Sequence, residues 1–270
     1  MFDLNRRQLL GGAVCAAAVL LGRRAAFAAP KSDAAAPEKT RAEQPGLPAP
    51  PQAANPAPSP LPRTVAGVRL PDTPLARSSV ALATAAYPPY LLNHALRTYV
   101  FGALSGRANQ LSFDLETLFL GCLLHDLGLT PKFEGDLPFE IQGAQGARKF
   151  LIEQGMPAVK ADMVWDGIAM HPLWIGSFKR PEISLVGAGA GADVIGPDPK
   201  EIPAAKVAET LSAFPRLRFK DQFLKTCTDV LTRHPRGAGQ TFMRDIAERY
   251  VPNFHHPNFC ERMAEAPFSE

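Results

Sequence analysis

The sequence predicts an all-α domain that begins near residue 64 of the 270-residue chain. From there on, apolar residues gather in long segments, and the alternation of apolar and polar residues that is typical of half-buried strands is missing. Runs of β-branched residues are few, which also favours helices over strands. About two hundred residues remain after the N-terminal part, enough for one apolar core.

Two of the predicted helices are apolar on most faces, those over residues 89–104 and 111–127. A helix that is hydrophobic all round belongs in the interior of a domain, so we expect both at the centre of the bundle. The eight segments that predict helices are residues 89–104, 111–127, 140–154, 158–171, 184–195, 203–214, 220–233 and 242–250.

The N-terminus has the order of a signal peptide, predicted over residues 1–28. The pair Arg6-Arg7 precedes an apolar stretch over residues 9–21, and small residues follow up to Ala28. The paired arginines resemble a twin-arginine leader, which predicts export to the periplasm or beyond. The apolar stretch is shorter than the roughly 20 residues that span a bilayer, so we expect cleavage and no stable membrane anchor afterwards. A retained anchor or ordinary Sec export is the alternative.

Residues 29–63 predict a disordered linker, because they are dense in Pro and Ala and almost free of large apolar side chains. The folded domain is then expected over residues 64–270. Lys and Arg number 29 against 26 Asp and Glu, and some of the excess of +3 lies in the leader. A nearly neutral domain offers no basic face for nucleic acid, so we expect no nucleic-acid partner. The motifs described below lead us to expect a small-molecule substrate instead.

The four cysteines are too few and too scattered for a disulfide scaffold or a CxxC zinc site. Cys15 lies in the leader, and Cys122 lies inside an apolar run and is expected to be a core thiol. Cys227 and Cys260 are the one candidate disulfide, with its geometry left open.

Polar residues inside the two apolar helices are the candidates for chemistry. His125 and Asp126 adjoin at the end of the segment 111–127, and His94 lies within the segment 89–104. A metal ion would compensate the charge of a buried carboxylate, which is costly to bury unpaired. Adjacent helical residues point about 100° apart, so His125 and Asp126 can bind one ion between them. The alternative is an aspartate that only hydrogen-bonds its neighbouring histidine.

Asp193 follows a stretch of Gly and Ala that begins at Gly187. Glycine costs about 1 kcal/mol relative to Ala in a helix, but small residues let backbones approach closely and leave room around a site. Asp193 would then face a metal centre. The alternative is plain close packing of helices, with Asp193 paired to an arginine.

The order His94, His125-Asp126 and Asp193, each on its own helix, resembles the HD-domain superfamily of metal-dependent hydrolases. The resemblance extends over residues 75–223 and is closest to the cyanamide hydratase-like branch. It depends on the flanking sequences NHALRTY, LHDLGLT, WDGIAMH and GADVIG, which contain His94, His125-Asp126, His171 and Asp193 in that order, and on Phe133-Glu134.

The resemblance implies an HD-domain helical bundle with the metal site among the central helices. It makes His94, His125, Asp126 and Asp193 the ligands of one divalent ion. Two imidazoles and two carboxylates fit Zn²⁺, Fe²⁺ or Mn²⁺, of which we expect Zn²⁺. The implied activity is activation of water for addition to a small molecule, such as hydration of cyanamide or a nitrile to an amide.

Lys132, Glu134 and His171 are the candidate catalytic residues. His171 is expected to act as a pocket acid or base, or else as a helix-end histidine turned by Pro172. Lys132 and Glu134 lie on a predicted loop after the His-Asp pair and would orient substrate or transfer protons, unless they are merely solvated. Aromatic residues near the motifs would wall an apolar pocket or belong to ordinary core: Phe133, Phe139, Trp165, Trp174 and Phe178.

Two other functions stay open at this stage. The first is an HD-domain phosphohydrolase of a nucleotide or other phosphoester, although that branch often has a lysine soon after its His-Asp-x-Gly element, where this chain has Leu129 and Thr130 before Lys132. Arg97 is a further candidate for an anion contact, or for a buried pair with a carboxylate. The second is a periplasmic binding or sensing domain without activity.

Overall fold

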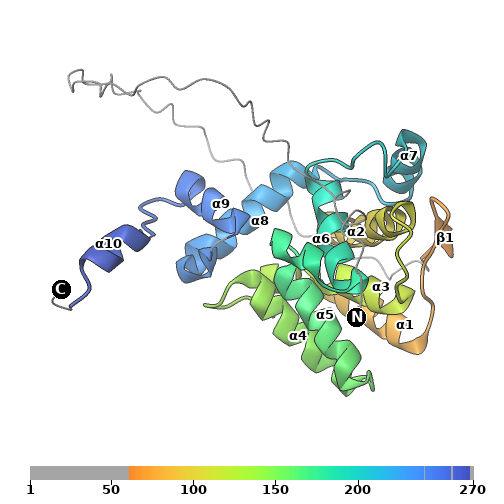
Figure 1. The fold of residues 1–270 in the computed structure, drawn as a ribbon, viewed down its shortest axis with the longest axis horizontal. Coiled ribbons are helices and arrows are strands. Elements are labelled where there is room, and N and C mark those ends of the chain that lie inside the picture. Colours follow the sequence, from red (N-terminus) through yellow and green to blue (C-terminus); the bar gives the residue numbers. More distant parts are fainter. Residues whose placement is uncertain (1–60, 240, 257, 268–270) are drawn as a thin grey trace, which may run out of the picture. The chain divides into compact units, whose positions relative to one another are not determined.

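The described part of the chain is mostly helical, with one short two-stranded hairpin, which confirms the all-α prediction (Figure 1). The computed structural model describes residues 61–239, 241–256 and 258–267. The predicted leader, residues 1–28, and nearly all of the predicted linker, residues 29–63, lie outside the described residues. Over the described ranges, no helix combines the length and the apolar character that a membrane crossing needs.

Helices α2 (Pro89–Ala108) and α3 (Leu115–Leu124) lie in the interior, as their apolar composition predicts. α2 begins with a proline at its first helical position, where the missing N–H costs nothing. α3 begins after Asp114, whose carboxylate accepts the Thr117 N–H at 2.7 Å. Most residues of α2 and nearly all of α3 are buried, so both helices can present polar side chains only to a site inside the domain.

Helix α6 (Pro181–Val194) packs closely along α2 through glycines on both helices. A Cβ atom added to Gly102 would clash with the carbonyl oxygen of Leu185, and one added to Gly189 would clash with that of Thr98. The Gly-Ala stretch thus has the close-packing role expected from the sequence. This approach places Asp193, near the end of α6, next to the middle of α2.

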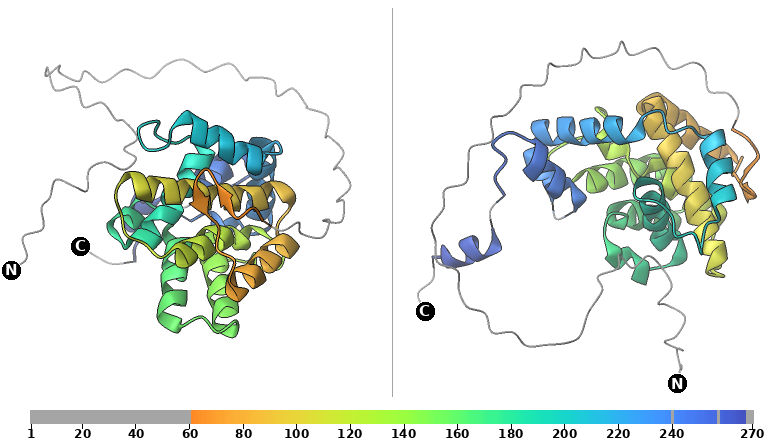
Figure 2. Two further views of the ribbon diagram at one scale, coloured as in Figure 1. Left: turned by 90° about the vertical axis from the view of Figure 1, so that its right-hand side faces the viewer. Right: turned by 90° about the horizontal axis from the view of Figure 1, so that it is seen from above.

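Helices α4 (Phe139–Glu153) and α5 (Ala158–Met170) lie side by side, joined by a short turn (the green helices in Figures 1 and 2). α5 also packs against α3 and α6, so its C-terminal end comes close to the centre of the domain. The short helix η1 (Leu127–Leu129) packs on α4. At Gly128, a Cβ atom would clash with the carbonyl oxygen of Phe139, so close packing requires glycine there.

Of the remaining elements, α8 and α9 share a second apolar cluster with Leu129 and Phe139. The remaining elements are β1 (Thr64–Val65) and β2 (Val68–Arg69), which pair antiparallel, α1 (Pro74–Ala86), η2 (Trp174–Phe178), α7 (Ala204–Ala213), α8 (Phe219–Arg233), η3 (Pro235–Ala238), α9 (Phe242–Tyr250) and α10 (Phe259–Ala264).

Several details differ from the predictions. The predicted helix 111–127 is shorter, because Asp114 caps its start and the chain turns at His125 before η1. The last residue of the predicted helix, Leu127, and Gly128 after it lie within η1. Cys227 is buried and Cys260 is exposed, and both are free thiols, so the candidate disulfide is not formed.

Candidate metal centre

Three polar side chains meet at the centre of the domain. His94 comes from α2, His125 caps the C-terminus of α3, and Asp126 follows it. Each has a relative exposure of 1%. The Nε2 atoms of His94 and His125 are 3.2 Å apart, and Asp126 Oδ2 lies 3.5 Å from the first and 3.3 Å from the second. We call these three residues the ligand group, since their nitrogen and oxygen atoms can hold one metal ion.

Hydrogen bonds fix which ring nitrogen of His125 has a free lone pair. His125 Nδ1 lies 2.7 Å from the carbonyl oxygen of Cys122, which can only accept, so Nδ1 donates. Burial, followed by the proximity of His94, lowers the pKa of His125 to about 3. The ring is therefore neutral at ordinary pH, and its Nε2 directs a lone pair into the ligand group.

His94 is oriented in the same way by Asp193. Burial raises the pKa of Asp193, but hydrogen bonds from His94 and Arg97 outweigh it and hold that pKa well below its usual range. The ionised carboxylate only accepts, so His94 Nδ1, 2.7 Å from Asp193 Oδ2, is the donor. With Nδ1 turned toward Asp193, Nε2 is the nitrogen of His94 that faces the ligand group.

Asp126 completes a set of atoms that fits a cation. Its Oδ2 is buried without a hydrogen-bond partner, and burial raises the pKa of this carboxyl group. Two imidazole nitrogens and a carboxyl oxygen face one another at these distances in the interior, an arrangement that a positive charge between them would stabilise. Two imidazoles and one carboxylate are also a known ligand set of catalytic metal sites, which keep a further position open. The residues therefore fit a divalent metal, whose identity the donor set leaves undetermined.

Asp193 lies behind His94, outside the ligand group. Its Oδ1 accepts from Arg97 Nε at 2.7 Å and from Arg216 Nη1 at 2.8 Å, while its Oδ2 accepts from Arg97 Nη2 and from His94 Nδ1, both at 2.7 Å. The arginine pairing that the sequence left as an alternative is thus present. The expected role of Asp193 as a fourth ligand stays a prediction.

His171, at the C-terminal end of α5, lies beside the ligand group. Its ring meets the His125 ring edge-on, with 4.8 Å between centroids, and Phe139 lies on another side. His171 Nδ1 donates to the Ile168 carbonyl oxygen at 2.7 Å. Burial, and then His125, lowers the pKa of His171 to about 3, so the ring is neutral and its Nε2 can accept a proton. The position agrees with the expected acid or base, and that role stays a prediction.

The structure does not bring Lys132 and Glu134 to the ligand group. Lys132 is exposed, with its Nζ 5.4 Å from the centre of the Phe133 ring. Glu134 accepts hydrogen bonds from Arg233 of α8 at 3.0 and 2.6 Å. Glu134 therefore fastens its loop to α8 in this structure, and the catalytic roles expected of both residues stay predictions.

The aromatic residues around the ligand group are partly those expected from the sequence. Phe139 contacts His171, but Trp174 and Phe178 are 77% and 70% exposed on η2. Phe219 stacks on His94, with 4.6 Å between ring centroids. Sequence reasoning missed Phe219 and Arg216, because neither lies near a motif and their approach to His94 depends on how residues 214–219 return to α2.

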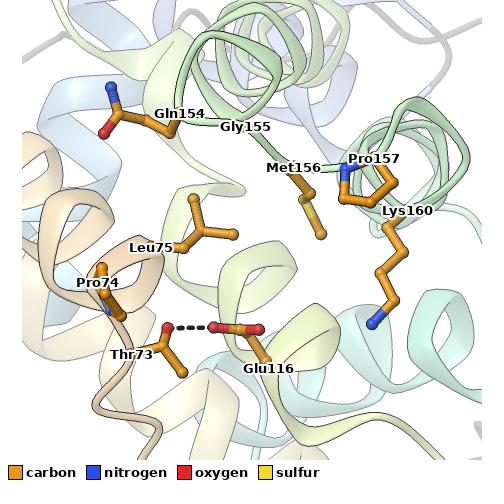
Figure 3. Close-up of a pocket in the computed structure, with 9 residues that line it drawn as sticks. All are labelled: Thr73, Pro74, Leu75, Glu116, Gln154, Gly155, Met156, Pro157 and Lys160. Carbon is orange, nitrogen blue, oxygen red and sulfur yellow. Dashed lines mark hydrogen bonds between the residues drawn. The ribbon is translucent and has the colours of Figure 1, made fainter.

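Two surface pockets lie away from the ligand group. The larger, of about 320 Å³, lies between the start of α1, α3, α5 and the turn before α5 (Figure 3). Leu75 and Met156 project into it, and Glu116 accepts a hydrogen bond from Thr73 at one side. The smaller pocket, of about 200 Å³, is lined partly by Trp165. Neither is lined by the ligand group or by a candidate catalytic residue.

Comparison with known proteins does not assign a family. No protein-family model matches the chain, and no curated protein sequence matches it. The geometry of the ligand group and the order of its residues along the chain are therefore the basis for a functional proposal.

Proposed function

We propose that this protein is a metal-dependent enzyme of the HD-domain type that activates water for addition to a small molecule. His94, His125 and Asp126 would hold one divalent ion, expected to be Zn²⁺. The observation that supports this proposal is the convergence of two imidazole Nε2 atoms and an unpartnered carboxyl oxygen within 3.5 Å of one another in the interior. The order of these residues on successive helices, which resembles the HD-domain superfamily, agrees with it.

Such an ion, when bound, supplies Lewis-acid activation of water. The protein contributes orientation, because the Cys122 carbonyl and Asp193 each fix one imidazole through its Nδ1 proton. His171 contributes a neutral ring beside His125, and its Nε2 would accept a hydrogen bond from the water and so orient it. The burial of the ligand group keeps bulk solvent from competing for the same positions.

Hydration of a nitrile-like carbon is the reaction we propose for this site. The oxygen of water adds to the carbon of C≡N and both protons of water end on the product, so that cyanamide gives urea and a nitrile gives an amide. Neither substrate needs an anion-binding pocket. Export through a twin-arginine route, which transports folded proteins, would suit an enzyme that acquires its metal before export.

Phosphoester hydrolysis is the second candidate, and the surroundings of the site favour it less. It requires cations that face a phosphate group. In the described part of the chain, the arginines seen at the site are Arg97 and Arg216, and both direct their donors to Asp193 and to backbone carbonyl oxygens. A phosphate would have to displace Asp193 to reach them.

Urea formation from cyanamide by the purified, metal-loaded protein tests the proposal. The controls are Asp126→Asn, which keeps the shape of a ligand, and Asp162→Asn, which changes an exposed aspartate of α5. We expect urea from the wild type and from Asp162→Asn, and none from Asp126→Asn. Equal rates in all three proteins would reject a metal-dependent reaction at this site. A metal-loaded wild type that is inactive on cyanamide, on other nitriles and on phosphoesters would reject the proposed activity.

A further inference from the structure

The turn formed by residues 214–219, between α7 and α8, is fastened to α2 just behind His94. Asn93 Nδ2 donates to the Pro215 carbonyl oxygen at 2.8 Å. Arg97 Nη1 donates to the Phe214 carbonyl oxygen at 3.0 Å. Both donors belong to α2, within one turn of His94. The turn is therefore fixed to the same stretch of helix that positions His94.

The backbone of this turn is strained. Leu217 and Arg218 have φ angles of 49° and 57°, in the left-handed region that residues with a side chain rarely adopt. Such a conformation costs on the order of 1–2 kcal/mol per residue, and it persists only where the surroundings impose it. Two consecutive residues in this region mean that the contacts made by their neighbours offset a considerable cost.

The residues on either side of the strained pair contact His94 directly or through Asp193. Arg216, just before the strained pair, donates to both the backbone oxygen and Oδ1 of Asp193 at 2.8 Å. Phe219, just after the pair, stacks on the His94 ring. The turn thus supports His94 on one face directly and at Nδ1 through Asp193.

The carboxylate of Asp193 has no lone pair left for a metal in this arrangement. A carboxylate offers about four lone-pair sites in its plane. Arg97 fills one on each oxygen, Arg216 fills the second on Oδ1, and His94 fills the second on Oδ2. To bind an ion beside His94 Nε2, Asp193 would have to give up the hydrogen bond that orients that ring.

Resting on the proposed metal centre, we infer that Asp193 is a positioning residue and that three protein side chains hold the ion. Asp193 holds the Nδ1 proton of His94 and makes Nε2 a better ligand, as carboxylates behind metal-bound histidines do. Arg216, brought in by the strained turn, is a positioning residue for Asp193. The side chain of Arg216 is 29% exposed, whereas Arg97 is fully buried, so Arg216 is the partner of Asp193 that can be replaced with least damage to the fold.

Titration of the purified, metal-free chain with Co²⁺, followed by visible absorption, tests this inference. Loss of an outer partner of a metal-bound histidine costs about 10- to 100-fold in affinity. We expect Asp193→Asn to bind Co²⁺ about 10- to 100-fold more weakly with unchanged band positions, since no ligand is lost. Arg216→Gln should weaken binding about 10-fold, and Arg216→Lys should restore part of the loss. Arg148→Gln, which breaks an exposed pair with Asp162, is the matched control.

Three results would overturn the inference. A folded Asp193→Asn protein that binds no Co²⁺, or whose bands move, would make Asp193 a ligand. An Arg216→Gln protein that binds as tightly as Arg148→Gln would overturn the role of Arg216 and the turn, whether or not Asp193→Asn folds. These results leave the proposed function standing, whereas a wild type that binds no Co²⁺ would reject both.

Discussion

Asp126 is the residue on which the proposed metal centre depends most directly. Its Oδ2 is buried beside two imidazole nitrogens and accepts no hydrogen bond. Asp126→Asn removes the carboxyl group and keeps the shape of the side chain, so we expect the metal content of the purified protein to fall to background. This loss is larger than the loss of about 10- to 100-fold in metal affinity that follows when a residue behind a metal ligand is replaced. Elemental analysis measures it, with Asp162→Asn alongside. Metal retained in equal amount by both variants would exclude Asp126 as a ligand.

Glu140 is a second buried carboxyl group, and it should make the stability of the fold depend on pH. It lies in the first turn of α4, its Oε2 has no hydrogen-bond partner, and burial raises its pKa to about 7. The folded state therefore binds a proton that the unfolded state, with an ordinary pKa of 4.5, releases. Stability is full below pH 4.5 and falls as the pH rises to about 7, by about 3 kcal/mol at most.

Glu140→Gln should remove the loss of stability that occurs as the pH rises from 4.5 to about 7. We expect the free energy of unfolding of the variant to exceed that of the wild type above pH 7 and to change less between pH 4.5 and pH 7. Urea unfolding across this range measures both. Glu153→Gln, in the last turn of the same helix and 59% exposed, is the control. Parallel pH profiles for wild type and Glu140→Gln would contradict the prediction.

The parts of the site that the sequence predicts are those with a local signal. His94 and the pair His125-Asp126 stand out because each is polar within a buried, apolar helix. Arg216 gives no such signal, since an arginine in a loop is ordinarily solvated, and only the path of residues 214–219 brings it to Asp193. Glu134 lies close to Asp126 in the sequence, but nothing in the sequence indicates that Arg233 binds it.

At the scale of elements, the close contact of α2 and α6 controls the position of His94. A Cβ atom at Gly189 would meet the Thr98 carbonyl oxygen, which belongs to the backbone and cannot give way. Gly189→Ala should force the helices apart at a cost of about 1–3 kcal/mol, and it should weaken the hydrogen bond between His94 and Asp193. Chemical unfolding measures the first effect and the affinity for Co²⁺ the second.

Gly191, two residues further along α6, is the matched control. An added Cβ there meets no atom within 4 Å. Alanine is the better helix former by about 1 kcal/mol, so Gly191→Ala should stabilise the protein without changing metal affinity. If Gly189→Ala lowers the free energy of unfolding and Gly191→Ala raises it, the destabilisation comes from the contact between α2 and α6. A Gly189→Ala protein as stable as Gly191→Ala would show that the helices can separate at no cost.

The sequence predicts some of the helices to within a residue and misses others. The predicted range 242–250 agrees with α9, and the predicted ends of α5 and α8 differ by one residue. α1 was missed although Thr73 and Pro74 have the pattern of an N-cap followed by proline, and the Thr73 hydroxyl does accept the Ala76 N–H. The two-residue strands of the hairpin are too short to show any alternation.

At the scale of the whole molecule, the stability of the domain should depend on pH, because two histidine side chains at its centre are uncharged in the folded state. His125 and His171 are contributed by different helices, and the folded state holds the pKa of each at about 3, below the ordinary 6.5. Below pH 6.5 both histidines bind protons in the unfolded chain, whereas in the folded state they stay unprotonated down to about pH 3. The free energy of unfolding is therefore unaffected by these two histidines above pH 6.5. It decreases as the pH falls toward 3, by a few kcal/mol in order of magnitude.

Acid should consequently unfold the metal-free protein cooperatively between pH 6.5 and pH 3, and His171→Gln should shift that transition to lower pH by removing one of the two groups. Glutamine keeps a side-chain amide that can donate to the Ile168 carbonyl oxygen, as His171 Nδ1 does. Circular dichroism along an acid titration measures the midpoint, with His255→Gln, an exposed histidine, as the control. Because a bound ion stabilises only the folded state, metal should move the wild-type midpoint further into acid. Identical midpoints for His171→Gln and His255→Gln would show that the buried ring titrates freely and that the centre is open to solvent.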